Sequence, residues 1–170
     1  MGIAQETELS VVQLGQVLPD ITLPCTSGKV FKTSQLKDKF TILYFYPKNH
    51  SPGCTIEAQD FSANFELFEK KNCQIFGVSR DKIEKHEAFK QEQSLPFELI
   101  GDVDHQLCDL LGVIEEKEMF GKTIMSLSRS TFLFNQSGEL IMQWRKVDVR
   151  NHIHDVMKVI ESSKLLKKAN

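Results

Sequence analysis

The residue whose surroundings best suit chemistry is Cys54, at the end of a loop that runs from Pro47 through Ser51, Pro52 and Gly53. An apolar run precedes the loop and a stretch with helical spacing follows it, so we expect Cys54 at a helix start. Unpaired backbone N–H groups and the helix dipole favour a thiolate over a thiol there. The prolines stiffen the loop, and the glycine admits a small ligand close to the backbone. The spacing therefore predicts a nucleophilic cysteine.

The elements that must position this loop follow from the apolar patterning. A central strand buried on both faces is indicated by the nearly continuous apolar run before Pro47. Asp81 is predicted to cap the start of a helix, and Gly112 is predicted to end one. We expect strands at 21–23, 30–32, 40–46, 74–79, 97–100, 130–134 and 139–144, and helices at 55–71, from Asp81 to about 93, at 105–111 and at 149–163.

This order predicts an α/β protein with a thioredoxin-like fold, a mixed central sheet flanked by helices and an N-terminal hairpin. The active sites of such sheets lie at the carboxyl ends of the parallel strands, which is where the Cys54 loop falls. Because 170 residues suit one domain, we expect a single domain over 1–170, with its core at about 14–160 and flexible ends.

Composition excludes several classes of protein. The net charge is −2, with 41% hydrophobic and 26% charged residues, and no basic stripe for nucleic acid is present. The sequence contains no run of 18 apolar residues, so no membrane span is predicted. Residues 1–10 lack the pattern of a secretion signal. A cytoplasmic protein is the expectation.

Two pairs of residues could in principle bind a metal ion, but neither pair is expected to do so. His152 and His154 should point to different sides of a helix, so solvent-exposed histidines are expected rather than a metal site. Asp102 and Asp104 fit a turn and a helix cap better than a calcium loop. No metal, flavin or haem is predicted.

The Cys54 loop resembles the active-site loop of the peroxiredoxins, Pro-x-x-x-(Thr/Ser)-x-x-Cys. The details Tyr46-Pro-Lys and Pro-Gly-Cys54-Thr-x-Glu57 resemble the bacterioferritin comigratory protein, or Q-type, branch. The similarity continues in order through 77–81, 95–97, 129–133 and 144–147. It spans about residues 14 to 160.

This resemblance implies a role for each matching residue. Cys54 would be the peroxidatic cysteine, Ser51 would hydrogen-bond the peroxide, and Pro47 would shield the thiolate from water. Arg129 would hold the thiolate and polarise the peroxide, a task that suits a guanidinium with several donors. Tyr46 and Glu57 would support the loop.

The resemblance also implies that the usual resolving cysteine is missing. Many Q-type members carry it five residues after the peroxidatic cysteine or in the next helix, where this chain has Gln59 and Lys90. Three further cysteines remain. Cys73 is expected at the far end of the sheet and Cys108 in the core, whereas Cys25, in an early turn, is expected to be exposed and is the candidate unconventional resolver; a role for Cys108 stays open.

The sequence therefore predicts a thiol-dependent peroxidase that reduces hydrogen peroxide, and organic hydroperoxides, through a Cys54 sulfenic acid. A one-cysteine cycle would use an external thiol, thioredoxin or glutathione/glutaredoxin, and the resemblance implies a monomer. A thioredoxin-like disulfide oxidoreductase is disfavoured because no Cys-x-x-Cys is present. A peroxide-driven redox sensor or holdase, which passes oxidation to a partner protein, remains an alternative because it would use the same loop.

Overall fold

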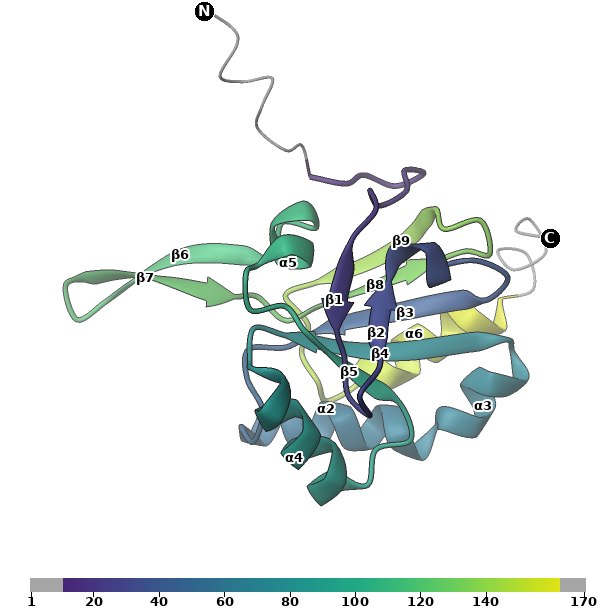
Figure 1. The fold of residues 1–170 in the computed structure, drawn as a ribbon, viewed down its shortest axis with the longest axis horizontal. Helices are drawn as coiled ribbons and strands as arrows, with labels where there is room; N and C mark the ends of the chain where they lie inside the picture. The colour runs from purple at the N-terminus through teal and green to yellow at the C-terminus, as the bar shows by residue number, and fades with distance from the viewer. Residues whose placement is uncertain (1–10, 163–170) are drawn as a thin grey trace, which may run out of the picture.

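The computed structural model describes residues 11–162, and the predicted flexibility of the two ends lies outside them. A five-stranded mixed sheet forms the centre, in the order β5-β4-β3-β8-β9 (Figure 1). β3, β4 and β5 are parallel to one another, whereas β8 is antiparallel to β3 and to β9. The bounds are β3 (Phe40–Phe45), β4 (Cys73–Ser79), β5 (Glu98–Gly101), β8 (Ser130–Phe134) and β9 (Leu140–Arg145).

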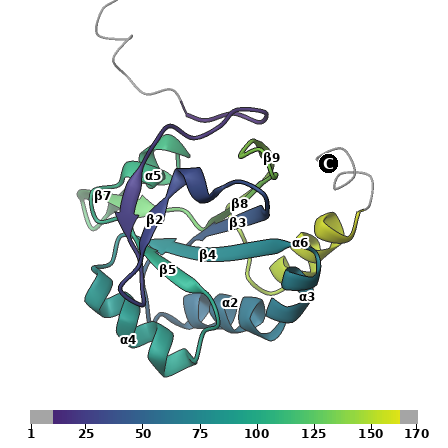
Figure 2. The same cartoon turned by 45° about the vertical axis from the view of Figure 1, so that its right-hand side comes forward.

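Helices α2, α3, α4 and α6 lie on one side of this sheet, and the N-terminal hairpin with α5 lies on the other (Figures 1 and 2). Alternation along β3 explains the two layers. Ile42 and Tyr44 belong to the apolar cluster under the helices, while Leu43 and Phe45 belong to the cluster under the hairpin. The helices are α2 (Pro52–Ala63), α3 (Phe65–Lys70), α4 (Ile83–Gln93), α5 (Gln106–Leu110) and α6 (His152–Glu161); the hairpin is β1 (Thr22–Pro24) and β2 (Val30–Lys32), followed by the 3-10 helix η1 (Thr33–Gln35).

The predicted fold class is confirmed: the chain is α/β, with a thioredoxin-like mixed sheet, and the expected strands and hairpins are present to within a few residues. The expected helix at 55–71 is wrong as a single helix, because it breaks at Asn64. The Asn64 side chain donates to the carbonyl of Asp60 at 2.9 Å, and its backbone leaves the helical region at φ −106° and ψ 8°. A side chain that competes for backbone groups in this way ends α2 there.

One hairpin was not anticipated from the sequence. β6 (Ile114–Met119) and β7 (Lys122–Leu127) pair antiparallel and project from the body of the molecule (Figure 1). The two residues that join them, Phe120 and Gly121, both have positive φ, at 53° and 76°. A two-residue turn of this kind matches the twist of the strands, but phenylalanine is not the residue that usually signals it.

Candidate active site

Cys54 lies where the sequence predicts it, in the first turn of α2 after the loop that leaves β3. Pro52 is the first helical residue, and the backbone N–H of Thr55 donates to the carbonyl of Ser51 at 2.9 Å. Proline suits this position because its missing N–H would have had no helical partner. The Cys54 side chain is only 1% exposed, so its sulfur sits below the surface at the carboxyl end of β3.

Arg129 joins Cys54 to Glu57. Its Nη2 lies 3.4 Å from Cys54 Sγ, and its Nη1 donates to Glu57 Oε1 at 2.8 Å. A planar guanidinium can serve two acceptors from two nitrogens, which a lysine ammonium cannot do with the same geometry. Arg129 directly precedes β8, and β8 pairs with β3, so the sheet carries the arginine to the loop.

Gly53 has a use that the sequence did not reveal. A Cβ at this position would lie 3.1 Å from Arg129 Nη2. The glycine thus leaves room for the guanidinium beside Cys54, and not only for a ligand near the backbone.

Burial and the contact between Arg129 and Glu57 together determine the pKa values of these two side chains. Burial raises the pKa of Glu57 to about 7, although Arg129 opposes this change through its charge and its hydrogen bond. Burial also opposes the charge on Arg129, but Glu57 and Cys54 raise its pKa overall. The cluster therefore holds a cation that stays charged beside a carboxyl that titrates near neutrality.

The loop between β3 and α2 is anchored from behind. The hydroxyl of Tyr46 donates to Asn49 Oδ1 at 2.7 Å and lies 3.2 Å from His86 Nδ1. The backbone N–H of Asn49 donates to Asp81 Oδ2 at 2.7 Å. Asp81 is therefore not the cap of α4 as predicted, since the cap residue is Lys82. Its carboxylate instead accepts from the loop, together with the hydroxyl of Ser79 at 3.1 Å.

Ser51 and Pro47 lie in the same loop, as expected. The Ser51 hydroxyl donates to the carbonyl of Lys48 at 3.4 Å, so it is oriented by the loop itself. Pro47 is partly buried next to the fully buried Tyr46. Their predicted roles toward a peroxide stay predictions.

His152 was expected to be exposed, and this is wrong. It is 4% exposed and packs edge-on against Phe61 and Trp144, with ring centroids 6.2 and 5.9 Å apart. Its Nε2 lies 2.7 Å from Thr131 Oγ1 and 4.0 Å from Glu57 Oε2. The first turn of α6 packs inward because its apolar face covers α2, a tertiary effect that the spacing of two histidines does not reveal. His154 is exposed, as expected.

Cys25 was also expected to be exposed, and it is buried at 4%. An isolated bridge to Ile100 draws it into the cluster on the hairpin side of the sheet, whereas Cys54 lies on the helix side. Burial, and then the charge of Glu98, raise the pKa of Cys25 to about 11. A neutral thiol behind the sheet is a poor partner for Cys54.

Cys73 and Cys108 are buried as predicted. Cys73 begins β4 beside Phe40, so most of the length of β3, roughly 17 Å at about 3.3 Å per residue, separates it from the Cys54 loop. A disulfide needs Cα atoms within about 7 Å. Burial raises the pKa of Cys73 to about 12, and burial and then Asp102 raise that of Cys108.

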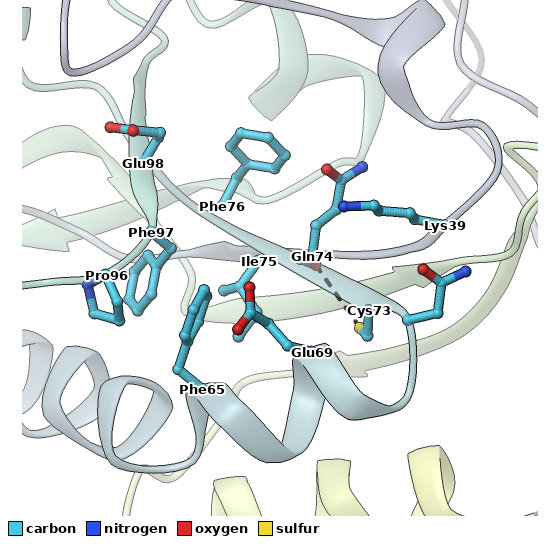
Figure 3. Close-up of a pocket in the computed structure, with 11 residues that line it drawn as sticks. Lys39, Phe65, Glu69, Cys73, Gln74, Ile75, Phe76, Pro96, Phe97 and Glu98 are labelled. Atoms are coloured by element: carbon cyan, nitrogen blue, oxygen red, sulfur yellow. Dashed lines mark hydrogen bonds between the residues drawn. The ribbon is translucent and has the colours of Figure 1, made fainter.

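Figure 3 shows the cavity beside Cys73, about 200 Å³ in volume, with Phe65 and Phe97 among its lining residues. Cys73 points its sulfur toward the carbonyl of Gln74, at 3.7 Å. Because this cavity lies at the amino end of β4, it is separate from the site around Cys54.

The two positions at which the resemblance would place a resolving cysteine make structural contacts instead. Gln59 on α2 donates to Gln93 Oε1 on α4 at 2.8 Å. The ammonium of Lys90 donates to the carbonyls of Leu95 and Phe97 at 2.8 and 3.1 Å. All four cysteines are free thiols.

None of the helices within residues 11–162 is both long and apolar enough to cross a membrane.

Comparison with known proteins identifies the family of the chain. Residues 14–143 match the model of the AhpC/TSA family. The chain is 42% identical over 150 residues to peroxiredoxin Bcp of Bacillus subtilis, covering 88% of this chain and 96% of the relative, and 32% identical over 149 residues to peroxiredoxin Bcp of Escherichia coli K12, covering 88% and 95%.

Solved structures are similar as well. The bacterioferritin comigratory protein of Xanthomonas campestris superposes with a TM-score of 0.84 at 35% identity, covering 90% of this chain and 98% of the other. A cysteine-to-serine variant of the Q-type peroxiredoxin of Xylella fastidiosa superposes with a TM-score of 0.85 at 30% identity, covering 91% and 99%. With a buried cysteine at a helix start beside an arginine, the chain belongs to the AhpC/TSA family, in the bacterioferritin comigratory protein branch of the peroxiredoxins, which are thiol-dependent peroxidases.

Proposed function

We propose that Cys54 Sγ is the atom that attacks the peroxide. A bond forms between sulfur and one peroxide oxygen as the O–O bond breaks, and the sulfur gives up two electrons. The products are a Cys54 sulfenic acid and an alkoxide or hydroxide, which takes up a proton to leave as alcohol or water. The observation that carries this proposal is the 3.4 Å approach of Arg129 Nη2 to the buried sulfur of Cys54.

Arg129 is proposed to act on both sides of this step. Its positive charge favours the thiolate before the reaction, and its N–H groups can stabilise the charge that develops on the departing oxygen. Ser51 is proposed to orient the peroxide through its hydroxyl, and Pro47 to keep water from the sulfur. We propose hydrogen peroxide and organic hydroperoxides as substrates, since the X. campestris relative is described as reducing alkyl peroxides.

The cycle is proposed to use one cysteine and an external thiol. The burial of Cys25, Cys73 and Cys108, and their separation from the Cys54 loop by the sheet or by the length of β3, support this proposal. Thioredoxin or glutathione/glutaredoxin would then reduce the sulfenic acid. We propose that the chain works in the cytoplasm as a single domain and as a monomer.

A steady-state assay with hydrogen peroxide tests the proposal. We expect turnover in the presence of thioredoxin or glutathione/glutaredoxin, compared side by side, and none for Cys54→Ser. Cys73→Ala, which removes a buried thiol at the other end of the sheet, should keep the wild-type rate. Full activity of Cys54→Ser would overturn the assignment. Wild-type protein that reacts with one equivalent of peroxide, yet is recycled by neither thiol system, would favour the redox sensor or holdase.

A further inference from the structure

Glu57 has one oxygen that the site described so far leaves without a use. The carboxyl group is 1% exposed, and Oε1 accepts from Arg129. Within residues 11–162, Oε2 has no hydrogen-bond partner. A buried carboxylate oxygen without a donor is destabilising, most of all when it is charged, and such oxygens are rare in folded proteins.

His152 approaches this oxygen, with its Nε2 4.0 Å from Oε2. The same nitrogen is 2.7 Å from Thr131 Oγ1, and the Thr131 hydroxyl can either donate to it or accept from it. Thr131 is fully buried on β8, two residues after Arg129. The imidazole and the hydroxyl therefore adjoin the buried carboxyl of Glu57.

His152 also lines a cavity of about 430 Å³ at the junction of β9 and α6, together with the polar side chains of Lys146, Asp148, Asn151 and Asp155. His152 thus borders both this cavity and the buried carboxyl of Glu57.

We propose that Glu57 and His152, assisted by Thr131, form a proton-binding site that is coupled to the state of Cys54, with His152 as a positioning residue that connects this site to the cavity at the start of α6. In the reduced enzyme the thiolate, the guanidinium and the carboxylate would sum to one negative charge in a buried place. A proton on the pair cancels that charge. Oxidation of Cys54 to the neutral sulfenic acid removes the need for it, and the proton is released.

The charged groups around the pair agree with this coupling. Burial raises the pKa of Glu57 to about 7 against the effect of Arg129, with Asp60 adding to the rise. Burial lowers the pKa of His152 to about 4, which Asp155 opposes and Arg129 reinforces. The proton is therefore held on the carboxyl near neutral pH, with the neutral imidazole 4.0 Å from Oε2.

The reaction supplies a way to count this proton. Attack of the thiolate on hydrogen peroxide yields sulfenic acid and hydroxide, and one proton is needed to form water. If the pair releases its proton as Cys54 is oxidised, the enzyme takes up less than one proton from solution for each peroxide consumed. This inference rests on the proposed attack by Cys54.

The experiment is a single turnover of the full chain with one equivalent of hydrogen peroxide in weak buffer, read with a pH indicator. The fraction of Cys54 present as thiolate, measured by ultraviolet absorbance, corrects each count. We expect well under half a proton to be taken up near pH 6 and about one near pH 8.5. His152→Gln, whose amide can donate but not titrate, should take up about one proton at both. His154→Gln, on the exposed side of the same helix, should match wild type.

Uptake of one proton by the wild type at both pH values would overturn the inference, and this comparison does not depend on any variant folding. Equal shifts in His152→Gln and His154→Gln would also overturn it, because they would indicate a general effect on α6. If peroxide is not consumed at all, the proposed attack by Cys54 fails instead, which distinguishes the two failures.

Discussion

Arg129→Lys is the substitution that separates charge from geometry at this site. Lysine keeps the positive charge, so the buried carboxyl of Glu57 keeps a counter-ion. It offers one nitrogen, however, where arginine places Nη1 on Glu57 and Nη2 on Cys54, at 2.8 and 3.4 Å. Because the contact with the carboxyl is shorter and joins two full charges, we expect the lysine ammonium to stay with Glu57 and to lose its contact with Cys54.

The size of the effect follows from that lost contact. A hydrogen bond to a charged group contributes about 1.5–3 kcal/mol, and about 1.4 kcal/mol corresponds to a tenfold change in rate. The kcat/KM of Arg129→Lys for hydrogen peroxide should therefore fall by about 10- to 150-fold. Its unfolding free energy should change less than that of Arg129→Met, which leaves Glu57 without its charged donor. The carboxyl of Glu57, whose pKa is already raised to about 7, then takes up a proton, which limits the cost to about 1–3 kcal/mol.

The assay is the second-order rate of peroxide consumption in single turnovers, with thermal unfolding measured on the same samples. Glu57→Gln is the companion variant, since it leaves the guanidinium without its carboxylate partner. A rate for Arg129→Lys within about threefold of wild type, in a protein that unfolds normally, would refute the claim that the two nitrogens of Arg129 act on separate partners.

Three further outcomes follow from the same contacts. Gly53→Ala should slow the reaction with peroxide without unfolding the protein, because its Cβ would lie 3.1 Å from Nη2 of Arg129; an unchanged single-turnover rate would contradict this. Gly77→Ala should lower the unfolding free energy by about 1–3 kcal/mol in urea titrations, because its Cβ would lie 2.7 Å from Leu99 Cδ2; wild-type stability would contradict it. His152 has a folded pKa of about 4 against an ordinary 6.5, so the folded state binds fewer protons between these values and stability falls as pH falls through this window. In His152→Gln the unfolding free energy should depend less steeply on pH between about 7 and 4. The same slope as in the wild type would count against the burial of an uncharged His152 ring.

The nucleophile and its arginine could be predicted because local patterns carry them. A proline- and glycine-rich loop after an apolar strand places Cys54 at a helix start, and the family pattern identifies Arg129, 75 residues away in the chain. The layers of the fold follow in the same way, since the alternation along β3 assigns its side chains to two apolar clusters.

The burial of Cys25 and His152 could not be read locally. Cys25 is drawn inward by a single bridge to Ile100, and His152 by the packing of α6 against α2. Both depend on partners distant in sequence. For Gly53 the sequence predicts only room for a small ligand near the backbone. The structure adds that the guanidinium of Arg129 occupies the space beside this glycine.

The central claim is that Cys54 alone carries the reaction with peroxide and makes no disulfide within the chain. The most direct test is mass spectrometry of the reduced protein after one equivalent of hydrogen peroxide, with the products trapped and mapped. We predict a single added oxygen atom on the Cys54 peptide, with Cys25, Cys73 and Cys108 remaining free thiols. A disulfide between Cys54 and any of these three in high yield, or the oxygen on another cysteine, would contradict the account.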